Sequence, residues 1–144
     1  MTLEQLDNLV RIGKLNREPP DQAQIEGLIA RARERLEDLE VEGLSKAGRF
    51  SAAYTAAHLL ALAALRRHGY RSDNRYLVFQ CLQHTVGMES ARWRVLDRCH
   101  QLRNRIEYEG AGEIDDRLLA ELIEIARELL TLTEGLGSSD YALR

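Results

Sequence analysis

The sequence predicts an all-α protein, an antiparallel bundle of five or six helices. Three observations favour this fold class. Apolar residues recur at the three- and four-residue spacing of a helix in several segments, glycine or proline separates these segments, and no segment shows the alternation of a strand. The 144 residues, of which 44% are hydrophobic and 30% charged, suffice for one folded domain. Short connections between such helices favour a bundle around one core.

The first two expected helices are separated by a proline pair. The six helices are expected over residues 2–12, 22–42, 49–68, 74–86, 89–109 and 116–134. Leu6 and Leu9 belong to the apolar stripe of the first helix, and residues 17–20 break it. Asp21 follows the prolines and can cap the second helix, whose apolar stripe runs from Ile25 to Leu39.

The third expected helix is rich in alanine and apolar on more than one face. This pattern is typical of a central helix packed on several sides, and Gly69 can close it in a left-handed conformation. Ser72 or Asp73 can cap the fourth helix, and Gly87 ends it.

The last two expected helices are long. Glu89 or Ser90 starts the fifth, which ends at the break over residues 110–112. Asp115 or Asp116 caps the sixth. We expect one domain over residues 1–144, with a core bundle over residues 49–134. Residues 1–45 are an N-terminal helical extension of it, and residues 135–144 a flexible tail.

Several classes of protein are excluded by composition. No apolar run approaches the roughly 20 residues that span a bilayer, so no membrane span is predicted. Residues 1–14 lack the pattern of a secretory signal, so a cytoplasmic location is expected. Cys81 and Cys99 have no CxxC or histidine-spaced pattern and are predicted to be buried structural thiols. Neither a metal ion nor a cofactor is predicted.

Charge is unevenly distributed along the chain. Residues 51–105 contain nine arginines and only three acidic residues, whereas residues 106–144 contain ten acidic and three basic residues. Arginine suits phosphate recognition because its guanidinium pairs bidentately with oxyanions. However, 18 of the 20 basic residues in the whole chain are arginine, and pairing with the acidic C-terminal segment is an equal explanation.

The most polar part of a predicted helix runs from Asp97 to Gly110. Polar residues three and four positions apart share one face of a helix. The residues of this face are His100, Arg103, Asn104, Glu107 and Tyr108. Such a cluster is either a surface ladder of ion pairs, centred on Arg103 and Glu107, or a binding or catalytic site.

The run Leu102-Arg103-Asn104-Arg105-Ile106-Glu107-Tyr108-Glu109-Gly110 resembles the motif of HEPN domains (higher eukaryotes and prokaryotes nucleotide-binding). In that family, an arginine and a polar residue are followed by a histidine, with four residues between the arginine and the histidine. The segment 65–72 and the helix with His84 resemble the bacterial arrangement upstream of the motif, and the similarity covers residues 49–132. The resemblance implies an up-and-down helical core, a homodimer, an RNA or nucleotide ligand, and a nucleotidyltransferase-type or toxin-antitoxin partner.

One position departs from the family motif. Arg103 and Asn104 match it, but Tyr108 stands where the family has histidine. Ribonuclease members of the family are understood to cleave RNA without a metal ion, the histidine moving the 2'-hydroxyl proton and the arginine supporting the phosphate. A phenol with an ordinary pKa near 10 is a weak general base at pH 7. The motif is therefore expected to be degenerate.

Three functions stay open at this point. The first is a binding module in which Arg103, Asn104, Glu107, His100 and Tyr108 contact RNA or a nucleotide. The second is an active metal-independent ribonuclease, with Arg103 as phosphate ligand and His100 or Tyr108 as the acid or base. The third is a protein-interaction domain, because tyrosine and arginine are favoured at interfaces.

Overall fold

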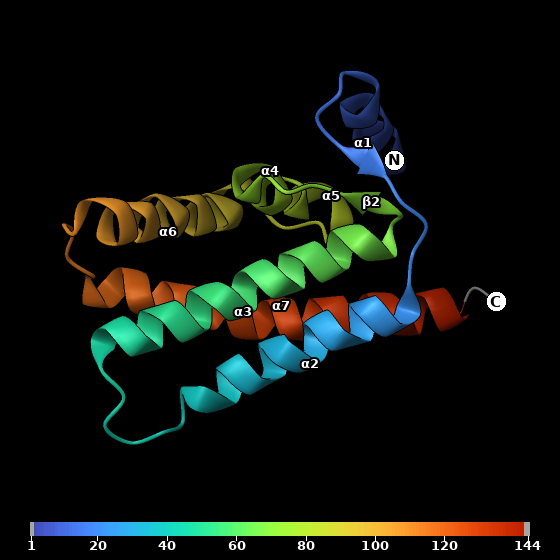
Figure 1. Ribbon diagram of the computed structural model, residues 1–144. Helices are drawn as coiled ribbons and strands as arrows, with labels where there is room; N and C mark the ends of the chain where they lie inside the picture. The colour runs from blue at the N-terminus through green and yellow to red at the C-terminus, as the bar shows by residue number, and fades with distance from the viewer. Residues whose placement is uncertain (1, 143–144) are drawn as a thin grey trace.

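The computed structural model describes residues 2–142 and, within them, the side chains of residues 4–137. Its elements are α1 (Thr2–Arg11), β1 (Asn16–Arg17), α2 (Gln22–Asp38), α3 (Lys46–Arg67), β2 (Tyr70–Arg71), α4 (Arg75–Gln80), α5 (Leu82–Thr85), α6 (Ser90–Glu109) and α7 (Asp116–Ala142). Helices dominate this part of the chain, which confirms the predicted all-α bundle (Figure 1). None of these helices is long and apolar enough to cross a membrane.

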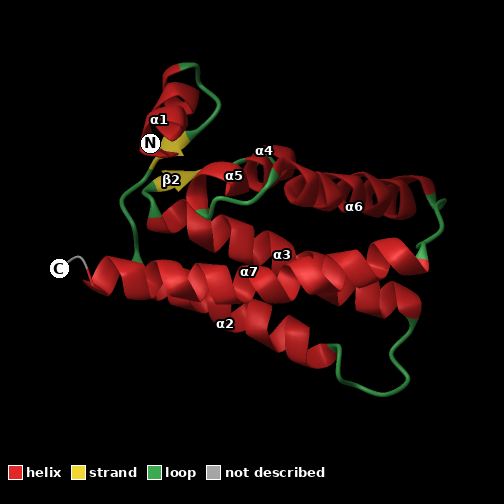
Figure 2. Cartoon of the chain, turned by 180° about the vertical axis from the view of Figure 1, so that it is seen from behind, coloured by secondary structure: helices red, strands yellow, loops and turns green. Residues whose placement is uncertain are grey.

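Four long helices, α2, α3, α6 and α7, form the body of the bundle. Figure 1 shows α2 and α6 running in one direction and α3 and α7 in the other. Both α2 and α7 pack along α3, and α4 and α5 lie between α3 and the start of α6 (Figure 2). We expected α2 to belong to an N-terminal extension, but it packs along α3 and buries Ile25, Ile29 and Leu36 in the common core.

The central position of α3 follows from its small side chains. Ala53, Ala56, Ala57 and Ala63 are completely buried, as is Leu60. Alanine allows two helix backbones to approach closely, and it favours the helical conformation more than any other residue. The expected central helix is thereby confirmed.

The helix ends agree largely with the expected caps. The Asp21 carboxylate accepts a hydrogen bond from the Gln24 amide at 3.2 Å, and the Asp115 carboxylate accepts one from Leu118 at 3.1 Å. The fourth helix is capped by Asn74 rather than by Ser72 or Asp73. Asn74 accepts from the amide three residues ahead, which is the geometry of a side-chain cap.

Besides shifts of three or four residues at the end of α2 and the start of α3, three larger details differ from the expectation. The two-residue strands β1 and β2 pair antiparallel, although no strand was predicted. Strands this short show no alternation of apolar and polar residues that a sequence pattern could reveal. The helix expected over residues 74–86 is divided at Cys81 into α4 and α5. The helix expected to end before Gly135 continues to Ala142, across most of the segment expected to be a flexible tail; residues 143–144 lie outside the described part.

Arg66, near the end of α3, holds the segment before α2 in place. Its side chain is only 2% exposed. The guanidinium donates to the Gln24 side chain and to the carbonyl oxygens of Glu18 and Pro19, each at 2.9 Å, and forms an ion pair with the Glu18 carboxylate at 3.1 Å. A buried guanidinium is tolerated only when its donors are satisfied in this way. Arg66 therefore fixes how the chain enters α2.

We expect Arg66→Ala to lower the free energy of unfolding by about 2–4 kcal/mol, because it removes a buried side chain together with its ion pair and its hydrogen bonds to the segment before α2. Urea denaturation followed by circular dichroism measures this loss. Arg71→Ala is the matched control, since Arg71 pairs with the same Glu18 but is 50% exposed. Its cost should stay below about 1 kcal/mol. Equal losses in the two variants would contradict this role of Arg66.

Candidate functional site

A cleft of about 350 Å³ opens between α3, the start of α4, the second half of α6 and the loop to α7. The apolar part of its lining, which we call the apolar wall, includes Phe50, Ile106 and Ile114. The polar part, which we call the polar wall, is formed by Tyr54, His58, Arg75, Arg103 and Glu107. The cleft thus combines apolar surface with a group of charged and hydrogen-bonding side chains.

Tyr54 is the centre of the polar wall. It is 2% exposed, and two guanidiniums lie near its ring, with their Cζ atoms 5.7 Å (Arg75) and 5.8 Å (Arg103) from the ring centroid. These distances are typical of cation–π contacts. Burial raises the pKa of the Tyr54 phenol, an effect that Arg75 and Arg103 oppose. The phenol is therefore protonated at neutral pH.

A hydrogen-bond chain connects α6 to this tyrosine. Arg103 donates to the Asn104 side-chain oxygen at 3.3 Å, and the Asn104 nitrogen lies 3.3 Å from Nε2 of His100. Nδ1 of His100 lies 2.9 Å from the Tyr54 hydroxyl oxygen, to which Arg75 also donates at 3.4 Å. Since an amide nitrogen only donates, Nε2 of His100 accepts and Nδ1 carries the proton.

The surroundings of His100 and Tyr54 determine where the protons of both side chains lie. Burial lowers the pKa of His100, with Arg75 as the next cause, so the imidazole is neutral at pH 7. Both of its ring nitrogens are occupied, by Tyr54 and Asn104. The Tyr54 oxygen accepts from His100 and from Arg75, so the hydroxyl proton of Tyr54 stays available to a ligand.

His58 presents its imidazole to the cleft one helical turn after Tyr54. Burial lowers its pKa to about 4, with further contributions from the charges of Arg75, His100 and Arg103. Its ring packs edge-on against Phe79, with the two ring centroids 5.9 Å apart. No hydrogen bond joins it to another described side chain. At neutral pH His58 is therefore an uncharged imidazole with its polar atoms available.

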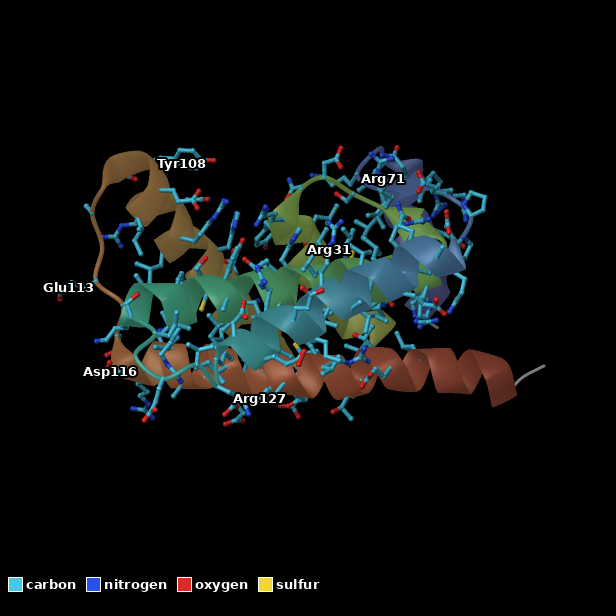
Figure 3. All side chains as sticks on the ribbon, turned by 60° about the horizontal axis from the view of Figure 1, so that its bottom comes forward. Arg31, Arg71, Tyr108, Glu113, Asp116 and Arg127 are labelled. Carbon is cyan, nitrogen blue, oxygen red and sulfur yellow. The ribbon has the colours of Figure 1, made fainter. Side chains whose placement is uncertain are left out.

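The expected polar face of α6 is divided in the structure. Arg103 and Glu107 form an ion pair at 3.1 Å and line the cleft, while His100 and Asn104 lie behind Tyr54. Tyr108 is 77% exposed and does not line the cleft. Figure 3 shows it near the end of α6, projecting from the ribbon. Eight residues advance a helix by about 80° beyond two full turns, so Tyr108 is rotated away from His100.

Sequence reasoning missed three residues of the cleft. Tyr54, His58 and Arg75 were not among the predicted site residues. One signal for two of them was readable, because Tyr54 and His58 are four residues apart in a helix otherwise rich in alanine and leucine. Arg75 carries no such signal, since only the fold brings the start of α4 beside α3.

The cysteines take no part in this site. Cys81 and Cys99 are buried and unpaired, and burial raises the pKa of each thiol to about 12. Thiols with so high a pKa are inert as nucleophiles at neutral pH. Among the described side chains, no group of three or more histidine, cysteine or acidic residues is placed to hold a metal ion.

Comparison with models of protein families, with curated proteins and with solved structures gives no match.

The low pKa of His58 predicts a pH dependence of stability. The unfolded chain, with a histidine pKa of 6.5, binds the proton more tightly than the folded chain with a pKa of about 4. The contribution of neutral His58 to the free energy of unfolding is thus fully present above pH 6.5. It is lost as the pH falls toward 4, and the loss is at most about 3 kcal/mol. His58→Gln should lose less stability than the wild type between pH 7 and pH 4.5 in urea denaturation. Equal losses in the two chains would refute the depressed pKa.

Proposed function

We propose that the chain is a HEPN-like module that binds RNA or a nucleotide in the cleft, and that it does not cleave RNA in the manner of the family ribonucleases. The observation that carries the proposal is that the Arg75 and Arg103 guanidiniums both contact the Tyr54 ring in the lining of the cleft. Two guanidiniums around one opening suit a phosphate group, with which arginine forms charge-assisted hydrogen bonds. The Tyr54 hydroxyl adds a neutral donor.

The charges of the cleft support an anionic ligand. Glu107 is the one carboxylate of its lining, and it is already paired with Arg103. Arg75 has no carboxylate partner among the described residues and donates only to Tyr54. The polar wall therefore keeps a positive charge that a phosphate can neutralise.

The apolar wall supports a ligand that also carries a base. Phe50, Ile106 and Ile114 line the same cleft as the arginines. A volume of about 350 Å³ is within the range of small-molecule sites, which combine an apolar surface with a few polar groups. One nucleotide, with its phosphate at the arginines and its base at the apolar wall, suits this division.

The expected general bases of a ribonuclease are poorly placed for catalysis. His100 has both ring nitrogens in hydrogen bonds, and Tyr108 lies outside the cleft. A general base needs to reach the proton it removes. These positions favour binding over cleavage.

Incubation of the protein with RNA in the presence of a chelator should leave the RNA intact. Cleavage that disappears in Arg103→Ala would overturn this part of the proposal.

The resemblance extends the proposal to the assembly. We propose a homodimer in the cytoplasm, with a nucleotidyltransferase-type or toxin-antitoxin protein as its partner. Light scattering at micromolar concentration tests the dimer, and a monomer under these conditions would contradict it.

We expect Arg75→Ala and Arg103→Ala each to weaken binding of 5'-AMP and of a labelled 12-nucleotide single-stranded RNA by roughly tenfold or more, because each removes a charged hydrogen bond to phosphate. Fluorescence anisotropy measures the RNA affinity and calorimetry the AMP affinity. Arg117→Ala, which changes an exposed arginine at the start of α7, is the control and should bind as the wild type does. Unchanged binding in both cleft variants, with unchanged melting temperatures, would refute the site.

A further inference from the structure

The nine arginines of residues 51–105 differ in the groups that they contact. Four of them have carboxylate partners among the described side chains: Arg66, Arg71, Arg92 and Arg103. Arg67 packs against Gly137, and Arg75 faces the cleft. The remaining three, Arg94, Arg98 and Arg105, are exposed and have no ion pair to any described side chain. Ion pairs within the chain therefore neutralise only some of the arginines in residues 51–105.

The three unpaired arginines share one line along α6. With Gln101 they occupy positions 94, 98, 101 and 105, whose alternating steps of four and three keep them on one face of a helix. They cover about 16 Å of helix length at 1.5 Å per residue. At 100° per residue this line, which we name the arginine stripe, lies about half a turn from Arg103 and hence from the cleft.

Acidic residues of α6 do little to neutralise the stripe. Glu107 pairs with Arg103 on the side of the cleft. Asp97 accepts a hydrogen bond from the Gln101 amide at 3.0 Å instead of pairing with a flanking arginine. Glu109, at the end of the helix, has no ion pair to a described side chain. The Arg94 guanidinium lies over the Trp93 ring, with its Cζ atom 5.2 Å from the ring centroid, and this contact leaves its charge uncompensated. All three arginines are exposed.

We propose that the arginine stripe is a second binding surface, separate from the cleft, and that it holds the phosphate backbone of a nucleic acid strand. Guanidiniums bind phosphate oxygens bidentately, and contacts of this kind follow the backbone without reading the sequence. The stripe presents polar side chains in place of the central apolar or aromatic anchors on which protein interfaces depend. A second copy of the chain is an unsuitable occupant, because a symmetric contact through the stripe would bring like charges together.

Binding to the stripe and binding to the cleft can be measured with different ligands. A mononucleotide is short enough to occupy the cleft alone, whereas a strand of 20 nucleotides can reach both surfaces. Loss of strand binding with unchanged mononucleotide binding is therefore the signature of the stripe. If the wild type fails to bind 5'-AMP, the function proposed for the cleft is refuted, and the titration with the strand still tests the stripe.

The decisive variant is Arg94→Gln/Arg98→Gln/Arg105→Gln. We expect it to bind a labelled 20-nucleotide single-stranded RNA roughly tenfold or more weakly than the wild type, and 5'-AMP equally well. The slope of log affinity against log salt concentration should fall by about 2, because three phosphate contacts contribute about 0.7 each for a single strand. Fluorescence anisotropy at 50–200 mM salt measures both quantities.

The matched control is Arg11→Gln/Arg117→Gln/Arg127→Gln, which removes the same charge from exposed positions on other elements. It should retain most of the RNA affinity. A loss equal to that of the stripe variant would show that only the net charge matters and would overturn the proposal. An unchanged affinity of the stripe variant would also overturn it. Polyglutamate that displaces the RNA at equal charge concentration would refute the assignment to nucleic acid.

Discussion

Close packing around α3 is the constraint on which the rest of the structure depends. Its alanines let α2 and α7 approach its backbone, so most of its surface is buried. Polar side chains on such a helix are acceptable only where they find partners or reach an opening. Tyr54 finds His100 and Arg75, and His58 reaches the cleft. The site is therefore the part of α3 that packing leaves uncovered.

The same constraint explains the electrostatics of the cleft. Apolar packing behind the polar wall removes water from Tyr54, His58 and His100, which keeps both imidazoles neutral at pH 7. The arginines remain charged because a guanidinium does not deprotonate in proteins. Positive charge in the cleft thus comes from Arg75 and Arg103 alone, and neutral groups beside them supply hydrogen bonds. This division between charge and hydrogen bonding suits recognition of an anion more than proton transfer.

The sequence was sufficient for the fold class and for part of the site. Helical periodicity and caps such as Asp21 are local features, so they were predictable, as was the ion pair of Arg103 with Glu107 four residues later. Tyr108 lies outside the cleft lining, because eight residues rotate a helix by about 80° relative to His100. Arg75 was not predictable, since its position beside Tyr54 depends on how α4 packs on α3. Long-range packing, which no local pattern specifies, therefore determined the rest of the cleft.

The central claim is that the cleft beside Tyr54 receives the phosphate ligand. The chain has four histidines, of which His58 and His100 adjoin the cleft while His68 and His84 lie outside its lining. Nuclear magnetic resonance of the imidazole rings during titration with 5'-AMP tests the claim most directly. We expect the ring signals of His58 and His100 to shift with a common affinity and those of His68 and His84 to stay unchanged. Shifts confined to His68 or His84, or no shift at His58, would contradict the claim.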